Sequence, residues 1–203
     1  MIKHEQFAVM TGIKPTGQFH LGSLMTARQV IYFQEQGAFA FYCIADLEAY
    51  EDNGIKLEES KSAAIGNVAD LLALGFDPRH SYIYRQSQEE RVKNLAISFA
   101  RGVTLATMKA IYGTRHLGLY LASLIQAGDI LLPQLQEFGG PKATIIPVGI
   151  DQDPHLRLTR DLASKFSSTY RFIPPASTYH KLLKALDGSP KMSKRSPMTY
   201  FTL

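Results

Sequence analysis

"FAVMTGIKPTGQFHLGS", residues 7–23, decides the fold, because an apolar run passes through a glycine-rich loop into a helix. The run "FAVM" (7–10) predicts a buried strand, and a helical pattern begins near residue 20. Gly12 and Gly17 let backbone N–H groups approach an anion, and the helix N-terminus adds partial positive charge. The stretch therefore predicts an α/β protein with a phosphate site after its first strand.

Strand-like and helical segments alternate along the rest of the chain. Further strands are predicted at 38–45, 82–84 and 143–149, and helices at 20–36, 57–74, 88–111, 118–132 and 154–166. The second helix is expected to bury Ala64, Val68, Leu71 and Leu72 on one face. Because βαβα order favours right-handed crossovers, we predict one doubly wound parallel sheet with helices on both faces. No linker or repeat indicates a second domain.

Composition limits the classes of protein that remain. The chain has 203 residues, of which 45% are hydrophobic and 20% charged, as in ordinary globular proteins. Its net charge of +4 suits an anionic partner without requiring nucleic acid. Cys43 is the only cysteine, which excludes an intrachain disulfide and favours a reducing compartment. With no leader-like or membrane-spanning apolar run, we expect a cytoplasmic protein without membrane attachment.

Two familiar classes of hydrolase are excluded by their missing motifs. The six histidines show no HExxH or other metal-ligand spacing, and no G-x-S-x-G elbow occurs. We therefore predict neither a metalloprotease nor a serine hydrolase, and no metal held by side chains.

A second candidate site follows the strand predicted at 143–149, in the loop "GIDQDPH" (149–155). Ligands of parallel sheets bind beyond the carboxyl ends of the strands. Carboxylate and amide groups there suit ribose hydroxyls and an α-ammonium, which both donate hydrogen bonds. Asp153 precedes a proline and is expected to cap the next helix, so Asp151 and Gln152 are the functional candidates.

A third candidate is the basic loop "PKMSKR" (190–195), whose prolines and glycines indicate a surface loop. Alone, it is equally compatible with a solvated basic loop. Together with a phosphate-facing helix terminus and a ribose-facing loop, it completes a nucleotide site. Lys191 and Lys194 are then placed to reach phosphates.

The order "TGIKPTGQFHLGS", "IPVGIDQDPHLRLTRDLA" and "PKMSKR" resembles class I aminoacyl-tRNA synthetases of the tryptophan and tyrosine branch, over almost the whole chain. "HLGS" stands where that family has its HIGH signature, and "KMSKR" stands where it has KMSKS. The segment "IDQDPHLRLTRDLA" is most similar to tryptophanyl-tRNA synthetases of the archaeal and eukaryotic type. The resemblance implies a Rossmann-like catalytic domain over residues 1–203.

The implied reaction is activation of an amino acid by ATP with Mg²⁺, followed by transfer to tRNA. Positioning and charge stabilisation should dominate such a reaction. The resemblance implies catalytic roles for His20, Lys191 and Lys194. The implied ATP contacts are Thr11, Gly12, His20, Gly22, Ser23, Gly149, Asp151, Lys191, Met192, Ser193 and Lys194.

The amino-acid pocket follows from the same resemblance. "LIQAGDILL" (124–132) is similar to the segment that recognises the substrate ring, with Gln126 and Asp129 on one helix face, although Asp129 also suits an internal hydrogen bond. The implied contacts are Met10, Glu48, Gln126, Asp129 and Gln152. Met10 stands where tyrosine enzymes, and many tryptophan enzymes of this type, carry a tyrosine. Because a thioether packs on an indole but gives a phenol no partner, tryptophan is favoured over tyrosine.

The sequence also departs from the family pattern. Ser23 replaces the second histidine of the first signature, and Arg195 replaces the last serine of the second. We expect the family's helical anticodon-binding domain to be absent, and therefore adenylate formation without efficient tRNA charging. A homodimer is a further implication. A nucleotidylyltransferase and a non-catalytic RNA-binding paralogue remain alternatives, which amino-acid-dependent pyrophosphate exchange would distinguish.

Overall fold

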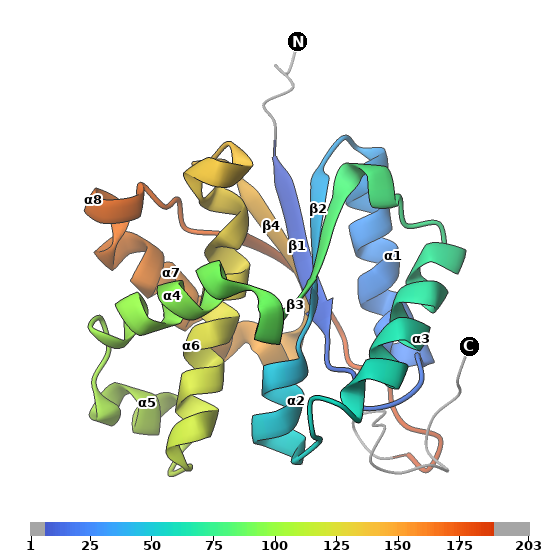
Figure 1. Cartoon of the computed structure of the whole chain (residues 1–203), viewed down its shortest axis with the longest axis horizontal. Helices are drawn as coiled ribbons and strands as arrows, with labels where there is room; N and C mark the ends of the chain where they lie inside the picture. Colours follow the sequence, from blue (N-terminus) through green and yellow to red (C-terminus); the bar gives the residue numbers. More distant parts are fainter. Residues whose placement is uncertain (1–6, 189–203) are drawn as a thin grey trace.

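A five-stranded parallel sheet forms the centre of the computed structural model, which describes residues 7–188 (Figure 1). The strand order is β3-β2-β1-β4-β5, and every neighbouring pair is parallel. The strands are β1 (Ala8–Ile13), β2 (Phe39–Ile44), β3 (Ser81–Arg85), β4 (Thr144–Gly149) and β5 (Ala176–His180). The predicted doubly wound parallel sheet is confirmed.

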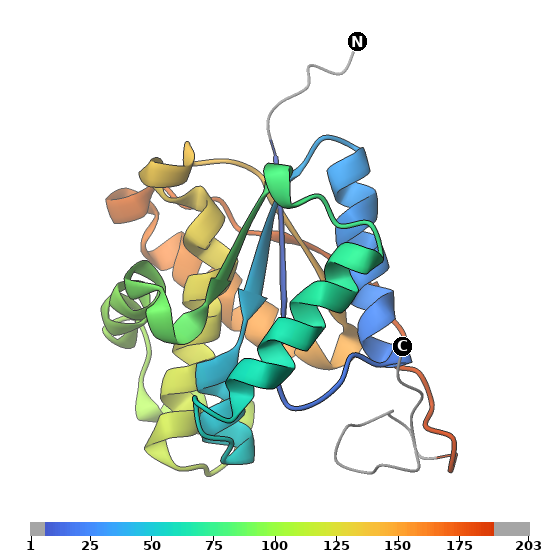
Figure 2. The same cartoon turned by 45° about the vertical axis from the view of Figure 1, so that its right-hand side comes forward.

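Helices cover both faces of this sheet (Figures 1 and 2). They are α1 (Leu21–Glu35), α2 (Asp46–Asn53), α3 (Ser60–Ala73), α4 (Glu90–Ala100), α5 (Leu105–Tyr112), α6 (Leu117–Leu131), α7 (Asp153–Lys165) and α8 (Ser167–Tyr170). One face carries α1 and α3, and the other carries α4, α6 and α7. Within residues 7–188, no helix is long and apolar enough to cross a membrane.

The central strands β1 and β2 are largely apolar because each supplies side chains to two cores. On β1, Met10 enters the core that contains α4, α6 and α7, whereas Val9 enters the core with α1 and α3. On β2, Phe41 and Tyr42 divide in the same way. The two cores hold β1 at the middle of the sheet, and the carboxyl end of β1 begins the site described below.

Four local predictions about the fold were incomplete or wrong. β5 and α2 were not predicted, because their sequences "ASTYH" and "DLEAYEDN" are short and mostly polar. The helix predicted at 88–111 is two helices, α4 and α5, separated by a turn at Gly102. A Cβ at Gly102 would lie 2.8 Å from the ring of Phe166, so this close approach favours glycine. Leu72, expected on the buried face of α3, is 40% exposed.

Candidate functional site

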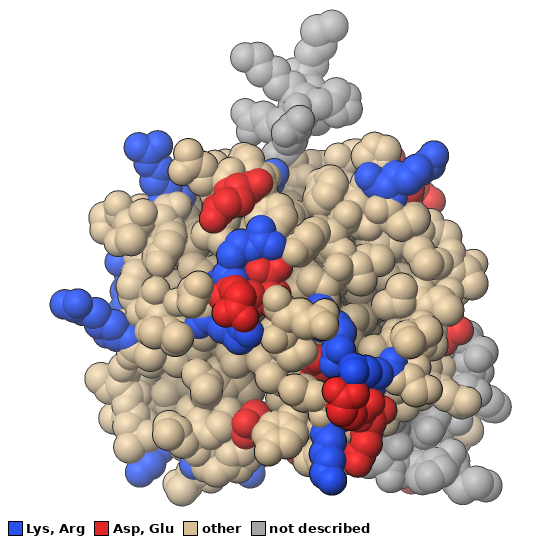
Figure 3. All heavy atoms as spheres, in the orientation of Figure 1, with Lys and Arg blue, Asp and Glu red and all other residues tan. Residues whose placement is uncertain are grey.

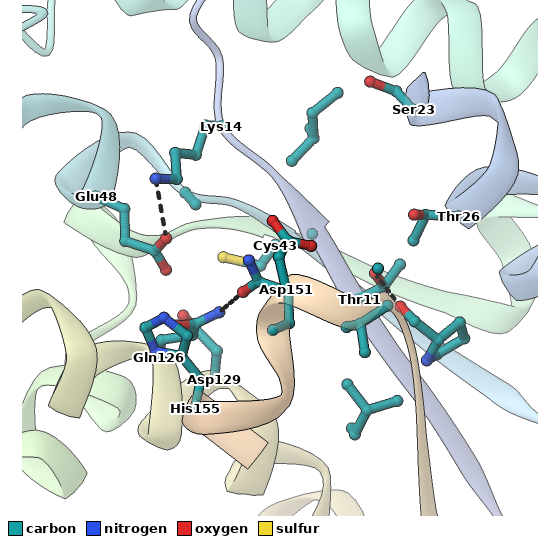
Figure 4. Close-up of a pocket in the computed structure, with 18 of the residues that line it drawn as sticks. Thr11, Lys14, Ser23, Thr26, Cys43, Glu48, Gln126, Asp129, Asp151 and His155 are labelled. Carbon is teal, nitrogen blue, oxygen red and sulfur yellow. Dashed lines mark hydrogen bonds and ion pairs between the residues drawn. The ribbon is translucent and has the colours of Figure 1, made fainter. Parts of the chain in front are cut away.

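A cleft of ≈ 990 Å³ opens at the carboxyl ends of the central strands (Figure 4). Segments far apart in the sequence line it: the loop after β1, the first turns of α1, the helix α2, the second half of α6 and the turn after β4. Every predicted site residue within the described part of the chain lines this cleft: Met10, Thr11, Gly12, His20, Gly22, Ser23, Glu48, Gln126, Asp129, Gly149, Asp151 and Gln152. Lys191, Met192, Ser193 and Lys194 lie outside the described residues.

His20 is the N-cap of α1, and its ring lies against the first turn of that helix. The Ser23 backbone N–H donates to His20 Nδ1 at 3.2 Å. A Cβ on Gly22 would lie 2.7 Å from His20 Cε1, so glycine leaves the space that the ring occupies. The N-terminus of α1 therefore faces the cleft with the imidazole of His20 and the hydroxyl of Ser23 at its positive end.

The β1 side of the cleft is fixed by close strand contacts. Gly12 lies so near β2 that a Cβ there would be 2.7 Å from the carbonyl oxygen of Cys43. Thr11 is buried, and its hydroxyl donates to the carbonyl oxygen of Pro147 on β4 at 3.2 Å. The predicted ATP contacts Thr11 and Gly12 thus lie at the junction of β1 with its two neighbours.

The turn after β4 differs from its predicted capping arrangement. Gln152 occupies the N-cap position of α7, and Asp153 is the first residue of that helix, so the expected Asp153 cap is wrong. The Asp153 carboxylate instead accepts hydrogen bonds from Arg157 Nε at 2.6 Å and from the Tyr179 hydroxyl at 2.7 Å. Because these partners occupy Asp153, the exposed Asp151 and the partly buried Gln152 remain on the cleft.

Two carboxylates lie deep in the cleft, Glu48 on α2 and Asp129 on α6. Asp129 is 2% exposed, and its Oδ1 accepts a hydrogen bond from the Tyr84 hydroxyl at 2.8 Å. Burial raises the pKa of Asp129 to about 8 and raises the pKa of Glu48 above its usual range. Burial thus favours the protonated form of both groups, and a partner that donates a hydrogen bond or carries positive charge would stabilise the ionised form.

A lysine and a histidine complete the polar lining. Lys14 Nζ lies 2.8 Å from Asp52 and 4.0 Å from Glu48, so it balances part of the acidic charge at the mouth of the cleft (Figure 4). Burial, followed by the charge of Lys14, lowers the pKa of His155 to about 4. The neutral imidazole of His155 shares a 3.1 Å hydrogen bond with the Tyr112 hydroxyl.

The geometry matches the family that the motifs indicated. The family model for class I tRNA synthetases of the tryptophan and tyrosine type matches residues 2–202. The chain belongs to this family. The match covers the strands and loops that build the cleft.

Relatives of this family member include archaeal tryptophan–tRNA ligases. The ligase of Hyperthermus butylicus is 45% identical over 97% of this chain and 54% of its own length, and that of Aeropyrum pernix is 44% identical with the same coverage. The crystal structure of the Aeropyrum pernix tryptophanyl-tRNA synthetase matches with a TM-score of 0.92, covering 98% of this chain and 55% of that one. The chain thus spans about half the length of the curated relatives it matches.

Sequence reasoning missed two residues that line the cleft, Lys14 and His155, and two that lie behind it, Tyr84 and Gln86. Lys14 and His155 lie inside the two loops that were selected, "TGIKPTG" and "GIDQDPH", so their positions carried a signal. Gln86 follows the carboxyl end of β3, where the strand-end rule applies. Its partners come from α2 and α6, which only the folded structure brings together.

Proposed function

We propose that this chain carries the amino-acid activation site of a tryptophan–tRNA ligase, which forms tryptophanyl-adenylate from tryptophan and ATP and supplies it for transfer to tRNA. The observation that carries the proposal is the single cleft that holds a helix N-terminus at one end and two deep carboxylates at the other. The archaeal relatives named tryptophan–tRNA ligase, at 40–45% identity, support the choice of substrate.

The deep end of the cleft is assigned to the amino acid. Glu48 offers a carboxylate to the α-ammonium, and Gln126 and Gln152 offer amide groups beside it. Asp129 accepts a hydrogen bond from the indole N–H. An apolar floor that includes Met10 packs against the ring and sets its position. The substrate carboxylate then faces the phosphate end of the cleft, which is the geometry that an in-line attack on the α-phosphate needs.

The other end is assigned to ATP. The N-terminus of α1, with His20 and Ser23, faces the phosphates, and Asp151 accepts hydrogen bonds from ribose hydroxyls. Thr11, Gly12, Gly22 and Gly149 line the nucleotide path without bulky side chains. Lys191 and Lys194, with Met192 and Ser193 between them, are proposed to cover the leaving pyrophosphate and to stabilise its charge.

Mg²⁺ is proposed to accompany ATP as part of the substrate. Among residues 7–188, no three His, Cys, Asp or Glu side chains gather as a metal site, and we assign no catalytic step to the ion. The other proposed partners are tRNA and a second copy of the chain. Large apolar side chains exposed on α5 and α6, Leu105, Leu117 and Leu121, are compatible with a homodimer. We propose the cytoplasm as its location, where a reduced Cys43 thiol is normal.

Charge distribution weakens the case for a purely RNA-binding paralogue. On the face drawn in Figure 3, Lys and Arg side chains lie beside Asp and Glu side chains and do not form one continuous basic field. On this face, such mixed charges give little non-specific phosphate attraction.

Pyrophosphate exchange tests the proposal, with tryptophan, tyrosine or no amino acid added to ATP and labelled pyrophosphate. We expect exchange that depends on tryptophan. Exchange with tyrosine alone would overturn the specificity. Exchange without any amino acid would favour a different nucleotidyl transfer, and absence of exchange with both amino acids would refute activation by this chain.

A further inference from the structure

Gln86 is a polar side chain that is 0% exposed and does not line the cleft itself. It lies in a short 3-10 turn (Gln86–Gln88) directly after β3. Its Nε2 donates to Glu48 Oε1 at 3.1 Å and to Asp129 Oδ2 at 2.6 Å. Its Oε1 accepts the backbone N–H of Glu48 at 3.2 Å.

The side-chain amide of Gln86 therefore has both of its N–H donors and its carbonyl oxygen hydrogen-bonded. An amide has two N–H donors and one carbonyl acceptor, and here each donor goes to a carboxylate on a different helix. The carbonyl is bonded to the backbone of the helix that carries Glu48. One buried group thus ties α2 and α6 together and holds two acidic side chains to a single nitrogen atom.

A neutral donor is the chemical type that this position needs. Glu48 and Asp129 lie close enough to repel each other, which adds to the effect of burial on the pKa of Asp129. The hydrogen bonds from Gln86 act in the opposite direction and lower the pKa of both carboxyls. A carboxylate at position 86 would place a third acidic group beside Glu48 and Asp129. An apolar side chain would deprive each of these two buried carboxyls of one hydrogen-bond donor.

We propose that Gln86 is a positioning residue for amino-acid recognition, whose amide fixes the spacing and orientation of Glu48 and Asp129 so that one receives the α-ammonium and the other the ring N–H. The inference rests on the proposed function, because it assumes that the two carboxylates bind tryptophan. Gln86 acts only through these two groups. ATP, which is assigned to the other end of the cleft, does not depend on it.

The effect that removing the Gln86 donors has on tryptophan binding should depend on pH. The titratable groups that face Asp129 are Tyr84 from β3, Cys43 from β2 and Glu48 from α2. Lys14 and Asp52 face Glu48 and remain unchanged in the variant. Without Gln86 both carboxyl pKa values rise, so a larger fraction is protonated at neutral pH. Because Asp129, with a pKa of about 8, is already protonated at pH 6 in the parent, the loss of tryptophan affinity should be smallest at pH 6 and greater at pH 8, where the parent carboxyl is about half ionised and that of the variant is less so.

The test compares Gln86→Met with the parent chain and with Gln88→Met, a matched control in the same turn whose side chain is exposed. Tryptophan binding is measured from ligand fluorescence, since the chain contains no tryptophan. ATP binding and thermal unfolding are measured in parallel. We expect Gln86→Met to weaken tryptophan binding by about tenfold to hundredfold at pH 7, with ATP affinity and Gln88→Met unchanged.

The outcomes separate the inference from the proposed function. A parent chain that binds ATP but no tryptophan would refute the proposed function itself. A parent that binds tryptophan, with Gln86→Met binding equally well, would refute only the role of Gln86. Equal loss of tryptophan and ATP binding at every pH would show a purely structural role. Should Gln86→Met fail to fold, Gln86→Asn, which keeps an amide in the buried position, is subjected to the same comparison and the same criteria.

Discussion

Gln126 Nε2 donates a 2.9 Å hydrogen bond to Gln152 Oε1, which joins α6 to the turn that precedes α7. The two glutamines come from different segments of the chain, yet both line the cleft and are hydrogen-bonded to each other. Each amide therefore orients the other before any ligand arrives. Pre-orientation of this kind reduces the ordering cost that binding must offset.

Loss of either glutamine should therefore remove the effect of the other. We expect Gln126→Ala and Gln152→Ala each to weaken tryptophan binding by about tenfold, and the double variant to lose less than the product of the two. A double-mutant cycle of dissociation constants measures the coupling. Gln136→Ala, at an exposed position, is the control. Strictly multiplicative losses would show that the hydrogen bond does not couple the two side chains.

Asp129 should make the folded chain less stable as pH rises. Its folded pKa of about 8 lies far above its unfolded value near 3.8, so the folded state holds a proton that the unfolded state releases. The contribution of Asp129 to the free energy of unfolding is fully present below about pH 4 and is lost as pH rises towards 8. Asp129→Asn should remove this decline, which urea unfolding between pH 4 and 9 would reveal as a difference between the two curves. Parallel curves would contradict a protonated Asp129.

His155 should act in the opposite direction and at lower pH. Its folded pKa of about 4 lies below its unfolded value of 6.5, so the unfolded state binds a proton first as pH falls. Stability from His155 is present above about pH 6.5 and declines between 6.5 and 4. We expect His155→Gln to lose this acid-sensitive component in the same unfolding experiment. An unchanged slope in that window would show that His155 titrates normally in the folded chain.

Lys191→Ala and Lys194→Ala should each slow adenylate formation by about a hundredfold to a thousandfold while tryptophan affinity stays the same. The reason is that their charge is needed when pyrophosphate leaves and not when the amino acid binds. Single-turnover measurement of adenylate gives the rate, and fluorescence titration gives the affinity. Lys184→Ala, at an exposed position before the loop, serves as the control. Parental rates in both variants would show an ordinary solvated loop.

Much of the fold could be predicted because buried parallel strands have a distinctive composition. β2 is almost uniformly apolar, so its position and burial follow from the sequence "FAFYCI". The strand-end rule predicts Asp151 and Gln152 beside a ligand site, and both residues line the cleft. β5 escaped prediction because an edge strand with one neighbour has less need for apolar side chains, and its sequence "ASTYH" is mixed.

Tertiary contacts account for what the sequence could not indicate. The break between α4 and α5 depends on the approach of Phe166 to Gly102, which are far apart in the chain. Asp153 looked like a cap because the residue type and the following proline favour one, but Arg157 and Tyr179 compete for its carboxylate. The hydrogen bonds of Gln86 require three separate segments to come together, and no local sequence pattern predicts that contact.

The placement of β4 beside β1 has a consequence for the chain as it leaves the ribosome. Ala8 pairs with Thr144, so one edge of β1 stays without its partner until the residues up to Thr144, 136 positions further along the chain (144 − 8), have been translated. At ordinary elongation rates that interval is on the order of ten seconds. The hydrogen bond from Thr11 to Pro147 forms only at the end of that interval, when the two sides of the cleft first meet. Nascent chains shorter than this point therefore have no completed pocket, and ligands cannot assist their folding.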